Sequence, residues 1–184
     1  MYNSPLSPKG RRGEQQNIIM YLFLIIGHTG QGKTKWVKNF IGSKNQYVFD
    51  LNNEYDLPPD TGGNIYPRMR HTELDIDKFV STIGRIRNTN IIFEDATGFL
   101  RGRQGSPLMR RIVAKRHTGN NFFIFFHSIN RVPPELMEMS NYIVLFKTID
   151  NIDNMRKFNN DVLTKHFIEL QKEEKFSYRI IELI

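Results

Sequence analysis

The densest group of residues suited to chemistry is a glycine-rich turn that follows an apolar run. The pattern G-x-x-x-x-G-K-[ST] is matched by Gly27, Gly32, Lys33 and Thr34. In this pattern backbone N–H groups surround a chain of phosphates, the lysine neutralises the β- and γ-phosphate oxygens, and the hydroxyl ligates Mg²⁺. The predicted nucleotide-contacting residues are Gly27, His28, Thr29, Gly30, Gln31, Gly32, Lys33 and Thr34.

The residues on either side of this turn predict the context that the pattern requires. The run Ile18–Ile26 is apolar and predicts a buried strand. After the turn, Val37, Phe40 and Ile41 follow helical spacing, and Gly42 is a stop signal. The amino end of that helix would point its positive dipole end at the bound phosphates.

A second candidate site is a pair of acids, Glu94 and Asp95, directly after the apolar residues Ile91, Ile92 and Phe93 of the predicted strand Asn90–Asp95. In P-loop ATPases one acid at such a strand end holds the Mg²⁺ shell and another polarises the attacking water. By position Glu94 is the metal-side acid and Asp95 the general base, with the exchange of these two roles left open. The alternative is an acidic strand end that is merely solvated.

Basic residues gather on one side of the next predicted helix, which Ser106 and Pro107 open as a cap and a first-turn proline. Its apolar stripe is formed by Leu108, Met109, Ile112 and Val113. Its other side carries Arg110, Arg111, Lys115, Arg116 and His117. We consider three interpretations: a solvated face, an arginine offered to the ATP of a neighbouring subunit, or contacts to DNA phosphates.

The segment Asn121–His127 is apolar between its two polar end residues, which predicts a central strand covered on both faces. This strand would deliver His127 to the edge of the sheet that carries the phosphate-binding turn. We expect His127 to sense the γ-phosphate, although a lone histidine is more often structural.

The remaining pattern is that of an α/β sheet protein. Further strands are predicted at Gln46–Asp50 and Tyr142–Phe146, with an edge strand at Phe176–Ile184. Between Pro58 and Pro67 the chain is expected to be an irregular connection. Further helices are predicted at Asp75–Arg87 and Met155–Lys175, and the packing candidates in the second are Val162, Phe167, Ile168 and Leu170.

Length and composition predict one domain over residues 17–184, preceded by a flexible basic tail over residues 1–16. The net charge is +7 and the isoelectric point is about 9.7, which favours a polyanionic partner. The absence of cysteine excludes disulfides and thiolate metal sites. The apolar run Ile18–Ile26 is too short to span a membrane and lacks the features of a secretion signal, so we expect a soluble, intracellular protein.

The order of these motifs resembles the HerA/FtsK superfamily of P-loop ATPases that pump DNA, in particular the compact genome-packaging ATPases of viruses and phages. The resemblance runs from Ile18 to Lys147. It rests on the phosphate-binding turn, on the strand with acids Ile91–Asp95, and on the segment Lys115–Gly119 that leads into the strand ending at His127.

The resemblance implies a RecA-like fold of the ASCE type: a mostly parallel sheet with helices on both faces, in which the strand of the phosphate-binding turn neighbours the strand ending at His127. It also implies ATP and Mg²⁺ as cofactors, a homo-oligomeric ring of five or six subunits, DNA held by its backbone, and contacts with capsid vertex proteins. Arg116 looks like the family's trans-acting arginine, with Arg110 or Arg111 as substitutes. The family usually has Asp-Glu where this chain has Glu94-Asp95, and a sensor glutamine where it has His127.

The expected function is therefore ATP-driven DNA translocation that loads a viral genome into a capsid, in the host-cell cytoplasm or at the packaging vertex. One alternative is another translocase of the superfamily, acting in plasmid mobilisation or chromosome processing. Another is a P-loop small-molecule kinase or nucleotide switch, in which Arg101–Arg111 would form a lid over the phosphates. A third is a non-catalytic protein that only binds nucleotide.

Overall fold

A computed structural model of the chain describes residues 20–61, 67–100, 107–156 and 158–183. Within these ranges the chain forms a seven-stranded sheet in the order β3-β2-β4-β5-β1-β6-β7. The strands are β1 (Leu22–Ile26), β2 (Gln46–Phe49), β3 (Arg68–His71), β4 (Asn90–Phe93), β5 (Asn121–Phe126), β6 (Tyr142–Phe146) and β7 (Tyr178–Glu182). Strand β7 pairs antiparallel with β6, and the other neighbouring strands are parallel.

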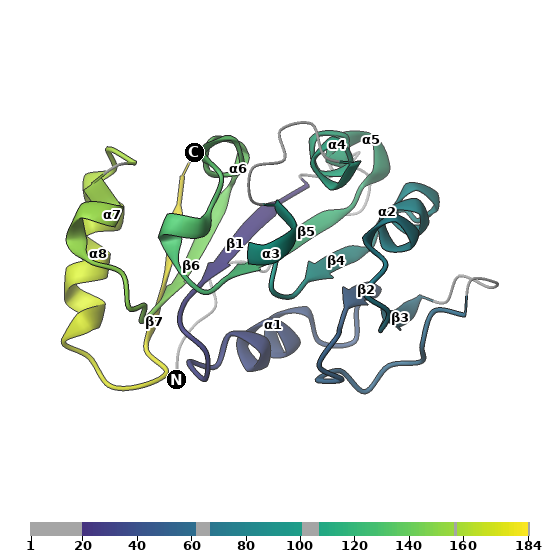
Figure 1. Cartoon of the computed structure of the whole chain (residues 1–184), viewed down its shortest axis with the longest axis horizontal. Coiled ribbons are helices and arrows are strands. Elements are labelled where there is room, and N and C mark those ends of the chain that lie inside the picture. Colours follow the sequence, from purple (N-terminus) through teal and green to yellow (C-terminus); the bar gives the residue numbers. More distant parts are fainter. Residues whose placement is uncertain (1–19, 62–66, 101–106, 157, 184) are drawn as a thin grey trace, which may run out of the picture.

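Helices cover both faces of the sheet, as Figure 1 shows. They are α1 (Lys33–Ile41), α2 (Ile76–Arg85), α3 (Thr97–Leu100), α4 (Pro107–Val113), α5 (Lys115–Thr118), the 3₁₀ turn η1 (Ile129–Arg131), α6 (Pro134–Met139), α7 (Ile152–Arg156) and α8 (Asp161–Gln171). Helix α1 packs on one face, whereas α2, α4, α6 and α8 pack on the other.

The buried apolar side chains form two clusters, one on each face of the sheet. Successive residues of a strand alternate between the two clusters, because side chains in a pleated sheet point to opposite faces in turn. In β1, Phe23 and Ile25 pack with α1, while Leu22, Leu24 and Ile26 pack with the helices of the other face. All five side chains are buried, which explains why the strand reads as a continuous apolar run. Burying one such side chain contributes about 1.5–3 kcal/mol to stability, so the apolar side chains on both faces stabilise these short strands.

This architecture confirms the predicted α/β fold with a mostly parallel sheet and helices on both faces. Strand β1 neighbours β5, and β5 lies between β1 and the acid-bearing strand β4, as the resemblance implied. The edge strand predicted at Phe176–Ile184 is also confirmed, as β7. The predicted basic tail over residues 1–16 lies outside the described residues, as do Ile18 and Ser106.

Three local predictions were wrong. Strand β3 follows the irregular connection and was missed, because its four residues Arg68–His71 are mostly polar and lie at the sheet edge. The long helix predicted at Met155–Lys175 is two helices, since Asn159 adopts a φ of 47° and the side chain of Asn160 caps the start of α8. Val113 is exposed rather than buried.

The predicted packing residues of the last helix were also only partly right. Phe167 and Leu170 are buried, but Val162 and Ile168 are exposed. Leu163 takes the expected place of Val162 in the core. In the ranges that the structure describes, no helix has the length and apolar character needed to cross a membrane.

Candidate active site

A cleft of about 620 Å³ opens at the carboxyl ends of β1, β4 and β5. Carboxyl ends of parallel strands are the usual place for ligands in open α/β sheets. The cleft is lined by Thr29, Gly30, Gly32, Lys33, Thr34, Lys35, Asn52, Glu54, Glu94, Asp95, Phe125, His127 and Phe176. The structure thus brings the phosphate-binding turn, both predicted acids and the predicted sensor histidine to one cavity.

The turn between β1 and α1 is fixed at its base by the two strands beside β1. The N–H of Gly27 donates to the carbonyl of Phe126 at 3.0 Å, and the N–H of His28 donates to the carbonyl of Lys147 at 2.9 Å. Gly30 and Gly32 have φ values of 75° and 88°, a backbone conformation that favours glycine. The loop is therefore held from both sides at its start and turns back to α1 through these two glycines.

Lys33 lies in the first turn of α1, and its side chain folds back into the loop. Its Nζ donates to the carbonyl oxygens of Gly27 at 2.6 Å and His28 at 3.0 Å. Burial lowers the pKa of Lys33, and the charge of Glu94 acts in the opposite direction. The ammonium is thus positioned between the loop backbone and the acids, where a phosphate chain would meet it.

Glu94 is buried at the floor of the cleft and touches the hydroxyls of two other residues. Tyr55 donates from its Oη to Glu94 Oε1 at 3.0 Å. The pKa of Glu94 is raised to about 7, chiefly by burial and also by the charge of Glu54, while hydrogen bonds with Tyr55 and Thr34 act in the opposite direction. A buried carboxylate next to the Thr34 hydroxyl is an arrangement that a bound cation would stabilise.

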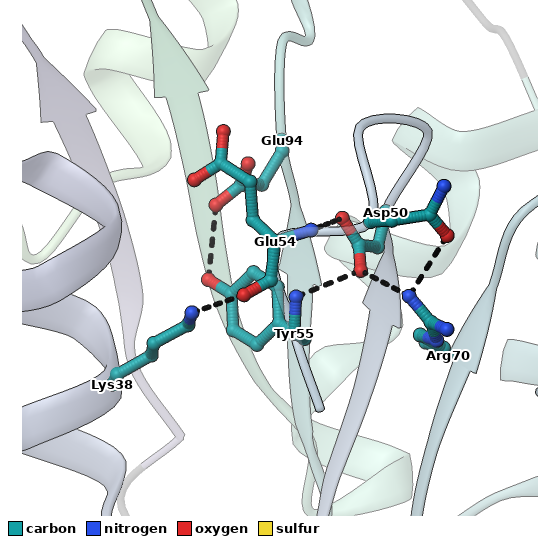
Figure 2. A network of polar contacts seen from close by, with 7 residues as sticks. Lys38, Asp50, Glu54, Tyr55, Arg70 and Glu94 are labelled. Atoms are coloured by element: carbon teal, nitrogen blue, oxygen red, sulfur yellow. Dashed lines mark hydrogen bonds and ion pairs between the residues drawn. The ribbon is translucent and has the colours of Figure 1, made fainter. Parts of the chain in front are cut away.

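The segment after β2 supports Glu94 from the side, as Figure 2 shows. Asp50 accepts the backbone N–H groups of Glu54 at 2.8 Å and Tyr55 at 3.0 Å, and it forms an ion pair with Arg70 of β3 at 3.2 Å. Lys38 of α1 donates to the carbonyl of Glu54 and lies 4.6 Å from the centre of the Tyr55 ring. These contacts fix the backbone that presents both Tyr55 and Glu54 to Glu94.

Asp95 and His127 form a second polar group on the more open side of the cleft. His127 Nε2 lies 3.4 Å from Asp95 Oδ1, and His127 Nδ1 lies 3.4 Å from Thr29 Oγ1. Asp95 has a φ of 51°. The backbone N–H of the next residue, Ala96, donates to the carbonyl of Phe125 in β5. Burial lowers the pKa of His127, with the charge of Lys33 adding to the effect and that of Asp95 opposing it, which favours the neutral imidazole.

The donor set fits Mg²⁺ rather than a metal held by protein ligands alone. In the described ranges no three His, Cys, Asp or Glu side chains are grouped to hold a metal. The hydroxyl of Thr34 and the carboxylate of Glu94 are hard oxygen donors that meet at the cleft floor. Mg²⁺ is typically bound by one or two such protein groups together with phosphate oxygens and water.

The predicted basic residues lie away from this cleft. The backbone of Arg116 is in α5, which precedes the amino end of β5, whereas the cleft is at the carboxyl end of the strands. Figure 1 shows α4 and α5 on the opposite side of the molecule from the loop that joins β1 to α1. The side chain of Arg116 lies outside what the structure describes. Arg110 is exposed, and the guanidinium of Arg111 packs against Gly84 of α2.

Several cleft residues had no role in the sequence interpretation, namely Lys35, Asn52, Glu54, Phe125 and Phe176. Tyr55 was missed as well. A signal was available in the polar segment directly after the predicted strand Gln46–Asp50, which contains Asn52, Glu54 and Tyr55. If the strands are parallel, this segment leaves the sheet at the same edge as the phosphate-binding turn. Phe176 gave no signal, because it lies more than 140 positions from the turn that it accompanies.

No protein-family model and no curated protein sequence matches the chain. Solved structures do match it. The genome packaging NTPase B204 of Sulfolobus turreted icosahedral virus 2, in complex with ATP-gammaS, aligns with a TM-score of 0.75 and 12% identity over 89% of this chain and 92% of that chain. The same NTPase in complex with AMPPCP aligns with a TM-score of 0.74 and 13% identity over 89% and 93% of the two chains.

B204, described as the DNA-packaging ATPase of Sulfolobus turreted icosahedral virus, aligns with a TM-score of 0.67 and 11% identity over 89% of this chain and 92% of that chain. At these identities the likeness is one of fold. It extends over nearly the whole of both chains, so it concerns the fold of the domain as a whole. The chain therefore has the RecA-like α/β fold of P-loop NTPases, and its structure resembles those of viral genome-packaging NTPases.

Proposed function

We propose that the chain is an ATPase that moves DNA, acting as a ring of subunits to load a viral genome into a capsid. The observation that carries the proposal is the meeting of Lys33, Thr34 and Glu94 in one cleft at the carboxyl edge of the sheet. The likeness in fold to packaging NTPases that bind ATP analogues supports the direction of the proposal.

Each residue of the cleft has a role that follows from its position. The loop Gly27–Thr34 and the Lys33 ammonium bind the triphosphate, and Thr34 and Glu94 would hold Mg²⁺. Bound Mg²⁺ would supply positive charge to the β- and γ-phosphate oxygens. Asp95 orients the attacking water, and His127, neutral and 3.4 Å from Asp95, contacts the γ-phosphate side of the cleft.

The site of one chain is completed by a neighbour. The backbone of Arg116 precedes the amino end of β5, whereas the cleft lies at the carboxyl end, which supports a role for Arg116 at the γ-phosphate of another subunit. We propose a ring of five or six copies, with residues 17–184 as one ATPase domain. DNA binds through its phosphates to the positively charged chain, in the host-cell cytoplasm or at the packaging vertex of the capsid.

ATP hydrolysis tests this proposal when it is measured across protein concentrations with and without double-stranded DNA. The wild type should hydrolyse ATP cooperatively, and DNA should stimulate it. Lys33→Ala and Glu94→Gln should abolish turnover, and Asp95→Asn should reduce it while nucleotide binding persists. Leu74→Ala, at an exposed residue that does not line the cleft, serves as the control and should behave as wild type.

Other outcomes would point to the alternative functions. Slow hydrolysis that ignores DNA and protein concentration would indicate a nucleotide switch, and phosphorylation of a small acceptor would indicate a kinase. DNA-stimulated hydrolysis without uptake of DNA by capsids would favour another translocase of the same kind. Survival of every activity in Lys33→Ala would show that hydrolysis is not the function.

A further inference from the structure

The cleft has two chemically different ends on either side of Lys33. One end carries Glu94, Asp95 and His127, which follow β4 and β5. The other end carries Phe176, which precedes the edge strand β7. Because β1 lies between β5 and β6 in the sheet, the loop Gly27–Thr34 separates the polar end from the aromatic end.

Phe176 is an exposed aromatic side chain held against the phosphate-binding loop. It is 58% exposed, although a phenylalanine side chain usually lies inside a folded domain. Its Cδ1 lies 3.3 Å from the position that a Cβ would take on Gly32, so the ring borders the glycine directly. Its φ of 73° is a conformation that bulky residues rarely adopt, and such residues concentrate at functional sites.

The turn that carries Phe176 is fixed by contacts on both of its sides. Before it, Glu173 pairs with Arg179 of β7, and its carbonyl accepts from Lys147 Nζ. After it, the Tyr178 ring packs 5.4 Å from the Phe146 ring and 6.0 Å from the Trp36 ring, measured between centroids. Figure 1 shows this turn, between α8 and β7, at the same end of the molecule as the loop between β1 and α1.

We propose that Phe176 is the base platform of the site, where the ring stacks on the purine of a bound nucleotide. This inference rests on the proposed function, because it places one end of the same ligand. The γ-phosphate must face Glu94 and Asp95 for hydrolysis, so the base must extend to the other end of the loop. There the exposed Phe176 ring offers an apolar surface, with the Lys175 ammonium 5.1 Å from its centroid.

Stacking reads the face of a base and not its hydrogen-bonding edge, so it tolerates different bases. Adenine and guanine nucleotides should therefore both depend on Phe176. A ligand that has phosphates but no base should not depend on it at all. This difference separates a base platform from a residue that only supports the fold of the loop.

The test is calorimetric binding of AMPPCP, its guanine counterpart GMPPCP and inorganic tripolyphosphate, each with Mg²⁺, to the full chain. The variants are Phe176→Leu, which keeps the apolar volume but removes the ring, and Phe176→Trp, which keeps an aromatic face. Leu74→Ala, which removes a different exposed apolar side chain, is the matched control. Tryptophan emission of Phe176→Trp gives a second readout, since stacking on a base should quench it.

We expect Phe176→Leu to weaken both nucleotides by roughly 5- to 100-fold, the range of base–aromatic stacking, and to leave tripolyphosphate binding unchanged. Phe176→Trp should keep nucleotide affinity within about threefold of wild type. Equal losses for nucleotide and tripolyphosphate would overturn the platform and assign Phe176 to loop structure. Unchanged nucleotide affinity in Phe176→Leu would also overturn it, whereas failure of the wild type to bind any of the three ligands would refute the proposed function itself.

Discussion

At Gly27 the phosphate-binding loop passes so close to β6 that a Cβ atom there would lie 2.5 Å from the Cβ of Phe146. Glycine is required at this position by space. At Gly30 nothing lies within 4 Å of the position that a Cβ would take, and glycine is favoured there by its φ of 75°. One loop thus contains two glycines that are needed for different physical reasons.

We predict that Gly27→Ala lowers the free energy of unfolding by up to about 3 kcal/mol, the upper end of the usual cost of overpacking. Gly30→Ala should cost about 1 kcal/mol, because only the left-handed backbone conformation opposes it. Urea unfolding of the two variants and the wild type measures the difference. Equal unfolding midpoints for the two variants would contradict the steric explanation.

Among the elements, the segment after β2 contacts Glu94 through the Tyr55 side chain. Its own backbone is held by Asp50, which Arg70 of the short edge strand β3 contacts in turn. The edge strand β3, which the sequence interpretation missed, is thereby linked to Glu94 through the side chains of Arg70, Asp50 and Tyr55. Tyr55 is a positioning residue, because it acts through Glu94.

Tyr55→Phe removes only the hydroxyl that contacts Glu94. We expect Mg²⁺ to bind the AMPPCP complex about 10- to 100-fold more weakly in this variant, as is usual when a partner of a metal ligand is lost. Binding of AMPPCP in the presence of EDTA should be unchanged. Calorimetric Mg²⁺ titration of the AMPPCP complex measures the effect.

Tyr47→Phe is the matched control for this experiment. Tyr47 is also a buried tyrosine of the β2 region, and its hydroxyl donates to Asp60 Oδ2 at 2.8 Å, away from the cleft. Each variant loses a tyrosine hydroxyl that donates to a carboxylate, an interaction worth about 1.5–3 kcal/mol of stability. If Tyr47→Phe weakens Mg²⁺ binding as much as Tyr55→Phe does, the effect comes from stability and not from the orientation of Glu94.

At the scale of the whole molecule, Arg116 and the cleft lie at opposite ends of one sheet. A head-to-tail contact between copies would place the arginine end of one chain at the cleft of the next, and such contacts close into rings when the rotation permits. The role of Arg116 and the ring both stay predictions. They can be tested together by mixing two inactive variants.

Lys33→Ala and Arg116→Ala should each lose a factor of about 10³ or more in turnover when measured alone. Mixed in equal amounts, they should regain hydrolysis, because about a quarter of the interfaces in a random ring would pair an intact Lys33 with an intact Arg116. Arg87→Ala, which removes an exposed arginine outside the basic segment, should stay active in the same assay. Mixtures as inactive as their components would argue against an arginine acting between subunits.

The sequence by itself determined the α/β class, the phosphate-binding loop, the acid pair and most of the strands. These features are local: Gly27–Thr34 and Glu94-Asp95 are contiguous residues, and a buried strand reads as an apolar run wherever it lies in the sheet. Where the local pattern was weak, the prediction failed. The polar strand β3 and the break between α7 and α8 depend on edge position and on capping by Asn160.

Only the tertiary structure decided which distant residues complete the cleft. Tyr55 meets Glu94 across 39 positions, and Thr29 meets His127 across 98. Phe176 reaches Gly32 because the antiparallel strand β7 begins beside the loop. Contacts that depend on the order of the strands cannot be predicted from the local sequence, because the packing of the whole sheet brings the two side chains together.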